Sequence, residues 1–286
     1  MKISSLFNKE KTVFSFEVFP PKKTSPIETI YKTLDELKGL SPDLISVTYG
    51  AGGNVANTTT CDIASYITKT LGVPSVAHLT CVYSTKEGVL EQLAQFKERG
   101  VENILALRGD INPEIKRKHD FEYASDLIRF IKENGDFGVS GACYPECHME
   151  APNMADDIRN LKIKVEAGAD HLVSQLFFDN NTFHSFREKL AIADINVPVE
   201  AGIMPVINKN QIERMVSMCG ASLPAKFTKI MQRYEHNPEA LRDAGIAYAV
   251  DQIVDLISNG VDGIHLYTMN NPYVARKISE SISSLL

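Results

Sequence analysis

An acidic residue interrupts an apolar segment near the start of the chain. The stretch FSFEVFPPKK, residues 14–23, places Glu17 inside a hydrophobic run that ends in two prolines. A buried strand tolerates an unpaired carboxyl poorly, because burial costs free energy or moves the pKa of the group. Glu17 is therefore a candidate for proton transfer rather than an ordinary strand residue.

Further polar side chains stand where other apolar segments end. The set is Thr48, Tyr49, His78, Arg108, Gly109, Asp110, Tyr144, Glu146, His148, Gln175, Tyr267 and Asn270. An acid, an Arg-Asp pair, histidines and tyrosines suit proton transfer and the binding of a planar heterocycle better than nucleophilic attack. Taken alone, each residue has a structural alternative: His78 can be a core histidine, and Arg108 and Asp110 can form a strand-to-loop ion pair.

Eight short β-branched segments alternate with helical patterns and carry these side chains. The segments cover residues 12–20, 43–50, 74–82, 103–110, 137–146, 171–178, 197–206 and 263–270. Near-continuous apolar strands that alternate with helices indicate a parallel sheet covered by helices. Eight such units predict an α/β protein with a (β/α)8 TIM barrel, a single domain over residues 1–286. The active site of such a barrel lies at the carboxyl ends of its strands, where the polar side chains would meet.

Local signals mark where the helices begin and end. The stretches ERGVENILAL, EAGADHLVSQ and SNGVDGIHLY place Gly100, Gly168 and Gly260 just past a helix. These glycines are predicted to adopt the left-handed conformation that terminates a helix. The stretch STKE, residues 84–87, predicts a capping box at the start of another helix.

Composition and missing motifs exclude several classes of protein. The net charge is −6 without a basic stripe, so we expect no nucleic-acid partner. No apolar window is long enough for a membrane span, and the N-terminus lacks a signal peptide, so a cytoplasmic protein without membrane contact is expected. Five cysteines, an odd number, fit reduced thiols and no metal site. No GxGxxG follows a strand, and GxxxxGK and HExxH are absent.

Nine segments together resemble one known family. They are FSFEVFPPKK, SVTYGAGG, HLTC, ALRGD, YASDLI, ACYPECH, GADHLVSQLFFD, AGIMPV and HLYTMN. In this order and at these intervals they resemble methylenetetrahydrofolate reductase, over essentially the whole chain and without a regulatory domain. The resemblance implies a flavin, FAD rather than FMN, at the top of the barrel. NADH or NADPH would reduce the flavin and leave, and 5,10-methylenetetrahydrofolate would then be reduced to 5-methyltetrahydrofolate on the same face.

The resemblance also implies roles for two acids. Glu17 matches the general acid that protonates N10 of the folate, which opens the methylene bridge and leaves an iminium at N5. We expect the apolar neighbours Phe16, Val18 and Phe19 to raise the pKa of Glu17 toward neutrality. Asp110 matches the acid beside the flavin and the pterin, where it would accept hydrogen bonds from the amino-pyrimidine edge.

Further positions match binding residues of the family. Those matching the flavin site are Thr48, Tyr49, Ala51, His78, Arg108, Gly109, Asp110, Tyr123, Ala124, Tyr144, His148, Asp157, Asn160 and Lys164. Those matching the folate site are Glu17, Thr48, Asp110, Gln175 and Gln211. Asp157, Asn160 and Lys164 recur at helical spacing and are expected on one face of a helix. Arg108 is expected to meet the phosphates or ribityl chain of the flavin.

The chain departs from the family pattern at three places. Asn271 and Pro272 follow the last strand where the family usually has Arg, and Arg276 comes one helical turn later. Ile163 takes an often basic position, and Met215 takes an often aromatic one.

Two other functions remain compatible with these residues. The same folate reduction could draw its electrons from a partner subunit, or the chain could be a non-catalytic folate-binding subunit of a methyl-transfer complex. We also expect the chain to form a homo-oligomer.

Overall fold

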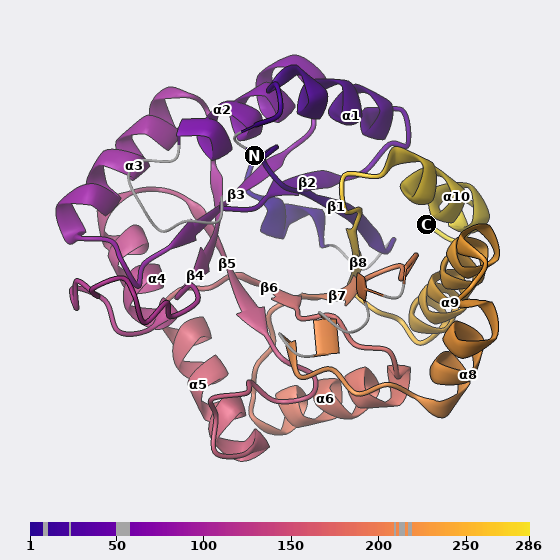
Figure 1. Ribbon diagram of the computed structural model, residues 1–286. Helices are drawn as coiled ribbons and strands as arrows, with labels where there is room; N and C mark the ends of the chain where they lie inside the picture. The colour runs from indigo at the N-terminus through magenta and orange to yellow at the C-terminus, as the bar shows by residue number, and fades with distance from the viewer. Residues whose placement is uncertain (8–10, 23, 50–57, 209, 212–214, 217–218) are drawn as a thin grey trace.

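Eight parallel strands close into a barrel, in chain order, with the last strand hydrogen-bonded to the first (Figure 1). The computed structural model describes residues 1–286 except 8–10, 23, 50–57, 209, 212–214 and 217–218. The strands are β1 (Val13–Val18), β2 (Leu44–Val47), β3 (Ser75–Thr80), β4 (Asn103–Leu107), β5 (Gly138–Cys143), β6 (His171–Ser174), β7 (Val199–Ile203) and β8 (Gly263–Tyr267). The predicted (β/α)8 barrel is confirmed.

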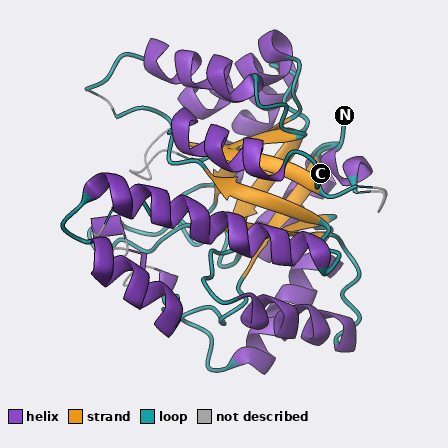
Figure 2. Cartoon of the chain, turned by 90° about the vertical axis from the view of Figure 1, so that its right-hand side faces the viewer, coloured by secondary structure: helices purple, strands orange, loops and turns teal. Residues whose placement is uncertain are grey.

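Helices form a ring around the barrel (Figure 1), and Figure 2 shows them lying across the outside of the strands. They are α1 (Glu28–Lys38), α2 (Thr58–Tyr66), α3 (Lys86–Glu98), α4 (Ala124–Asn134), α5 (Met154–Glu166), α6 (Asn180–Ile192), α8 (Ala225–Tyr234), α9 (Pro238–Ser258) and α10 (Pro272–Ile282). A π-helical turn, η2 (Ile67–Leu71), continues α2. Among the helices described, none combines the length and the apolar character needed to cross a bilayer.

Each strand begins within two residues of its predicted start but ends earlier than predicted. The segment predicted over 103–110, for example, leaves the ladder after Leu107, and the segment predicted over 171–178 leaves it after Ser174. The remaining apolar residues belong to the connecting loops, which periodicity does not separate from the strands. As a result, Arg108 and Gln175 lie just beyond their strands, at the rim of the barrel.

The three predicted helix-terminating glycines are confirmed. Gly100, Gly168 and Gly260 have φ angles of 76°, 118° and 66°. The predicted capping box at residues 84–87 is wrong by one position. Thr85 is the N-cap of α3, and its Oγ1 accepts a hydrogen bond from the Gly88 N–H at 3.1 Å.

Among the described residues, a short helix covers the amino-terminal end of the barrel. A short 3-10 helix, η1 (Ile3–Leu6), lies over it, and Ile3 packs into a cluster with inward-facing residues of β1 to β4. We call residues 1–7, which include η1, the amino-terminal plug. Asn103 holds it in place, because its Oδ1 accepts from the Ile3 N–H at 2.9 Å and its Nδ2 donates to the Met1 carbonyl at 3.1 Å. Access to the barrel interior is therefore from the carboxyl ends of the strands.

We predict a loss of stability on adding one methyl group to Gly245 of α9. A Cβ there would lie 1.8 Å from the Val206 carbonyl oxygen, a backbone atom after β7. Gly245→Ala must displace α9 and should lower the free energy of unfolding by about 1–3 kcal/mol. Gly88→Ala in α3 is the matched control, because its Cβ meets Thr85 Oγ1 at an ordinary 3.4 Å. Urea denaturation that ranks the two variants equally would contradict the prediction.

Candidate active site

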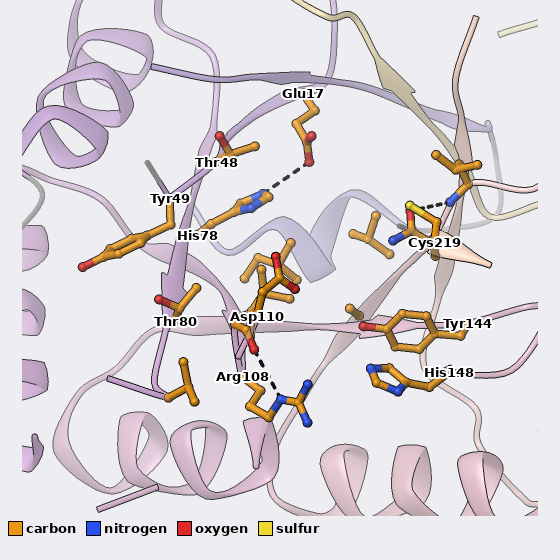
Figure 3. A pocket seen from close by; sticks show the side chains of 18 of the residues that line it. Glu17, Thr48, Tyr49, His78, Thr80, Arg108, Asp110, Tyr144, His148 and Cys219 are labelled. Carbon is orange, nitrogen blue, oxygen red and sulfur yellow. Dashed lines mark hydrogen bonds and ion pairs between the residues drawn. The ribbon is translucent and has the colours of Figure 1, made fainter. Parts of the chain in front are cut away.

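A cavity of about 600 Å³ opens at the carboxyl ends of the strands. Eleven of the candidate residues at strand ends lie on its wall: Glu17, Thr48, Tyr49, His78, Arg108, Gly109, Asp110, Tyr144, His148, Gln175 and Tyr267. Figure 3 shows eight of them as labelled side chains around one space. The apolar part of the wall includes Leu105, Leu107, Val173 and Met204. The fold therefore gathers residues that are up to 250 positions apart in the chain (Glu17 to Tyr267, 267 − 17).

The pleat of β1 directs Glu17 into the barrel. Its neighbours Phe16 and Val18 are fully buried and belong to the main hydrophobic core, on the opposite face of the strand. The end of β8 holds this backbone in place: Thr268 Oγ1 donates to the Glu17 carbonyl at 2.6 Å. The Asn270 side chain both donates to and accepts from the Phe19 backbone, at 2.8 and 3.0 Å.

Two imidazoles lie closest to the Glu17 carboxylate inside the barrel. Glu17 Oε2 is 3.6 Å from His78 Nε2 and 3.5 Å from His265 Nε2, and Figure 3 shows Glu17 and His78 pointing toward one another. Burial raises the pKa of Glu17, but the hydrogen bond to His265 and the charges of His78 and His265 outweigh it and leave this pKa below its ordinary value. The expectation of a raised pKa is therefore wrong, because His78 and His265 outweigh the effect of burial.

The pKa values of the two histidines shift in opposite directions. Burial lowers the pKa of His265, but its hydrogen bond to Glu17 and the negative charges of Glu200 and Glu17 outweigh burial and raise it above 6.5. Burial, with the charge of His265, lowers the pKa of His78 to about 4 despite Glu17. At neutral pH His78 is therefore neutral, whereas the acids around His265 favour its protonated form. His265 Nδ1 also lies 2.7 Å from Ser15 Oγ.

The low pKa of His78 predicts a pH-dependent loss of stability. Unfolding returns this pKa to about 6.5, so the unfolded chain binds more protons and stability falls as the pH drops from about 6.5 to about 4. We expect His78→Gln, which cannot titrate, to gain about 3 kcal/mol relative to wild type between pH 7 and pH 4. Urea denaturation across this range measures the difference, and parallel stability curves would contradict it.

At the rim, Arg108 is held by an acid that the sequence did not suggest. Its Nη1 and Nη2 donate to the two carboxylate oxygens of Glu150 at 2.5 and 2.7 Å. This bidentate pair raises the pKa of Arg108 and lowers that of Glu150. Gly109 turns the chain here with φ 88°, and a Cβ would lie 3.1 Å from the Thr80 side chain. The ion pair considered between Arg108 and Asp110 is replaced by one between Arg108 and Glu150.

Helix α5 supports the wall from behind. Asp157 Oδ2 accepts from the His148 N–H at 2.9 Å. Lys164 Nζ donates to the Ala142 carbonyl at 2.9 Å and lies 5.6 Å from the centre of the Tyr144 ring. Burial lowers the pKa of Lys164. Asp157 and Lys164 therefore shape the loop after β5 rather than line the cavity.

The remaining predicted residues lie away from the wall or outside the described part of the chain. Asn160 is exposed, Tyr123 is 66% exposed at the N-cap of α4, and Ala124 is buried. Gln211 Oε1 accepts from the Ile207 N–H at 3.1 Å, which braces the loop after β7. Ala51 falls among the residues that the structure does not describe.

The departures from the family pattern have local explanations. Asn271 caps α10, since its Oδ1 accepts from the Val274 N–H at 3.3 Å. Arg276 points to α1, where its Nη2 is 3.8 Å from Glu36 Oε2, and it does not line the cavity. Ile163 is exposed, whereas Met215 is on the cavity wall.

The wall offers groups that fit a flavin. Leucine, valine and methionine side chains provide an apolar surface for a planar ring, and a few polar groups surround it. Burial raises the pKa of Tyr144 to about 12, so its hydroxyl stays protonated and can donate a hydrogen bond. The Arg108 guanidinium at the rim suits anionic oxygens.

A closed barrel with titratable side chains around a cavity at its carboxyl end defines a (β/α)8-barrel enzyme. The sequence pattern of the family described as "Methylenetetrahydrofolate reductase" matches residues 2–283. The chain belongs to the methylenetetrahydrofolate reductase family of oxidoreductases, whose members reduce methylenetetrahydrofolate.

Relatives from bacteria and plants support this assignment. The chain is 35% identical to 5,10-methylenetetrahydrofolate reductase of Pectobacterium carotovorum, over 94% of this chain and 89% of that protein. It is 34% identical to the Escherichia coli (strain K12) reductase, over 94% and 90%. It is 35% identical to "Methylenetetrahydrofolate reductase (NADH) 1" of Arabidopsis thaliana, over 94% of this chain but 48% of the plant protein.

A solved structure shares the fold at low identity. An uncharacterized protein from Clostridium thermocellum, described as binding two copies of 5-methyl-5,6,7,8-tetrahydrofolic acid, superimposes with a TM-score of 0.72 over the full length of both chains. At 14% identity this likeness concerns the fold alone.

Proposed function

We propose that the chain reduces 5,10-methylenetetrahydrofolate to 5-methyltetrahydrofolate through a bound FAD, with NADH as the electron source. The observation that carries the proposal is the position of Glu17, a carboxyl 3.5 Å from the buried His265, on the wall of the same cavity as Asp110, Tyr144 and Gln175. The name of the Arabidopsis relative supports NADH as the donor.

The flavin site draws on the rim and the apolar wall. Tyr144 and His148 meet edge to face, with ring centres 4.6 Å apart, which fixes both rings beside the cavity. Arg108 would bind the anionic part of the cofactor. To do so, its guanidinium would give up one or both of its hydrogen bonds to Glu150, or donate to the cofactor alongside them. A flavin bound there by Arg108, Tyr144 and His148 would supply the hydride-transfer chemistry between NADH and the folate.

Folate reduction requires a proton as well as a hydride. Glu17 donates this proton to N10 as the methylene–N10 bond breaks, and the adjacent His265 replenishes it. Asp110 accepts hydrogen bonds from the amino-pyrimidine edge of the pterin. Gln175 adds an amide whose Oε1 is fixed by the Leu176 N–H at 2.9 Å. Thr48 completes the folate contacts from the end of β2.

The visible spectrum of the purified protein tests the proposal. The protein should be yellow, anaerobic NADH should bleach its flavin absorbance, and 5,10-methylenetetrahydrofolate should then restore it. A flavin that NADH cannot reduce would instead favour electron delivery by a partner subunit. A colourless chain that binds methyltetrahydrofolate would favour the non-catalytic binding subunit.

A further inference from the structure

The barrel contains a second acid–histidine pair below Glu17 that the proposed reaction does not use. Glu200 on β7 is 0% exposed and His171 on β6 is 1% exposed. His171 Nε2 lies 3.1 Å from Glu200 Oε2, an ion-pair distance. A fully buried carboxylate is costly, so its presence in the barrel core calls for a compensating interaction or a role.

Neighbouring residues fix the positions of the Glu200 and His171 side chains. Gly263 leaves the space that Glu200 fills, because a Cβ on Gly263 would lie 2.8 Å from Glu200 Cγ. Ser140 Oγ lies 2.9 Å from His171 Nδ1, and the Phe7 ring stacks on His171 with centres 4.7 Å apart. The position of Glu200 is thus fixed from β6, β8 and the amino-terminal plug.

Glu200 and Glu17 act on the same histidine from two sides. His265 lies on β8 opposite Ser15 of β1 and Gly202 of β7, two residues along β7 from Glu200. The negative charges of both acids favour the protonated form of His265. Glu200 pairs with Gly263 in the β7–β8 ladder, so the side chains of Glu200 and of His265, two residues further along β8, lie on the same face of the sheet. A negative charge nearby favours the protonated form of a histidine.

The other groups that face His265 do not supply this negative charge. His78, on β3, is neutral at neutral pH. Tyr267, on β8, meets the His265 ring edge-on at 5.2 Å, and burial raises its pKa well above 10, so it is neutral as well. His171, on β6, can only carry positive charge, which would oppose protonation of His265. The second negative charge beside His265 is therefore that of Glu200.

We propose that Glu200 is a positioning residue for folate reduction: it keeps His265 protonated, so that the Glu17–His265 pair holds one transferable proton when the folate binds. This inference rests on the proposed function of Glu17. The proton passes from His265 Nε2 to Glu17 Oε2 and then to N10 of the folate. The electron pair of the breaking methylene–N10 bond stays on N10, and His265 regains a proton from solvent.

The charge of His265 can be measured without catalysis. Ring-labelled histidine NMR of the whole protein gives a titration for each of its seven histidines, and His265→Gln identifies the resonance. We expect His265 to titrate above about 6.5 in wild type, and Glu200→Gln to lower its midpoint by at least about one pH unit. Glu200→Asp, which keeps the charge, should restore most of the shift. Ser140→Ala removes the contact with His171 without removing a charge, and it should leave the His265 midpoint unchanged.

The pH profile of the reaction gives the catalytic readout. In Glu200→Gln the rate of the folate half-reaction should begin to fall at a lower pH than in wild type, and the difference should equal the change in the His265 midpoint. The pH profile of flavin reduction by NADH should not change. A His265 midpoint that Glu200→Gln does not move, or an equal change in both half-reactions, would overturn the proposal. If wild type reduces no folate, the proposed function fails, and the NMR titration still decides whether Glu200 sets the charge of His265.

A second variant keeps the test decisive if Glu200→Gln does not fold. In Glu17→Gln, Glu200 is the remaining carboxylate acting on His265 among the described residues. We expect His265 in this variant to titrate at or above about 6.5 in spite of its burial. A midpoint well below that value would mean that Glu200 contributes nothing.

Discussion

Glu17→Gln is expected to slow the reduction of methylenetetrahydrofolate by at least about a hundredfold, while NADH reduces the flavin at a near-normal rate. The factor follows from general acid catalysis, which typically contributes about 10²–10⁴-fold. Hydride transfer from the nicotinamide to the flavin needs no proton at the pterin, whereas opening the methylene bridge does. Glutamine keeps the size of the side chain and its place between His78 and His265 but cannot donate an acidic proton.

Anaerobic stopped-flow measurements of the two half-reactions separate these effects. Glu146→Gln is a matched control at the same end of the barrel. Glu146 is outside the cavity wall and accepts from the Ser222 N–H at 3.0 and 3.1 Å, a contact that glutamine can retain. If Glu17→Gln reduces the folate as fast as the control does, the proton comes from another group.

Asp110→Asn should slow folate reduction by about ten- to a hundredfold and leave flavin reduction as fast as in wild type or faster. Asp110 is an exposed residue of the cavity wall. A hydrogen bond to a charged group is worth about 1.5–3 kcal/mol, and asparagine offers the pterin one acceptor oxygen without charge. Loss of a negative charge beside the flavin also makes its reduced form a weaker hydride donor.

Asp120→Asn is the control for Asp110→Asn. Asp120 lies on the same loop, and its Oδ2 accepts from the Lys86 N–H at 2.9 Å, away from the cavity wall. Separate measurement of the two half-reactions again decides. An equal loss in both half-reactions would make Asp110 a general binding or structural residue.

The barrel could be predicted from the sequence because its strands are buried on both faces. Continuous apolar runs, separated by helical periodicity and by glycines such as Gly100 and Gly168, are strong local signals. The ends of the strands were less predictable. The apolar residues after Ser174, for instance, continue into a loop whose departure from the ladder depends on tertiary contacts.

The environment of Glu17 could not be predicted, because it depends on which residues of eight strands reach the same layer of the barrel. Local sequence places Phe16 and Val18 beside Glu17, but the pleat turns them away. The residues that set its charge, His78 and His265, come from β3 and β8. The alternation of His265 with Tyr267 on β8 was an available signal, since both positions face the interior.

Contacts between loops could not be predicted from the sequence either. Arg108 pairs with Glu150, 42 positions later in the chain, rather than with its sequence neighbour Asp110. Asp157 and Lys164 have the predicted helical spacing, yet both bind backbone groups of the segment from Ala142 to His148. Side-chain spacing identifies a shared helix face, whereas the partner of that face follows from how the helix packs on the barrel.

We propose that the nicotinamide and the folate use one cavity in turn, and initial-rate kinetics of the wild-type enzyme test this most directly. The residues that we assign to the flavin and those that we assign to the folate line the same cavity of about 600 Å³. Rates measured at several fixed concentrations of methylenetetrahydrofolate with NADH varied should therefore give parallel double-reciprocal lines. Lines that intersect would mean that both substrates are bound together before hydride transfer, and would contradict alternating use of the cavity.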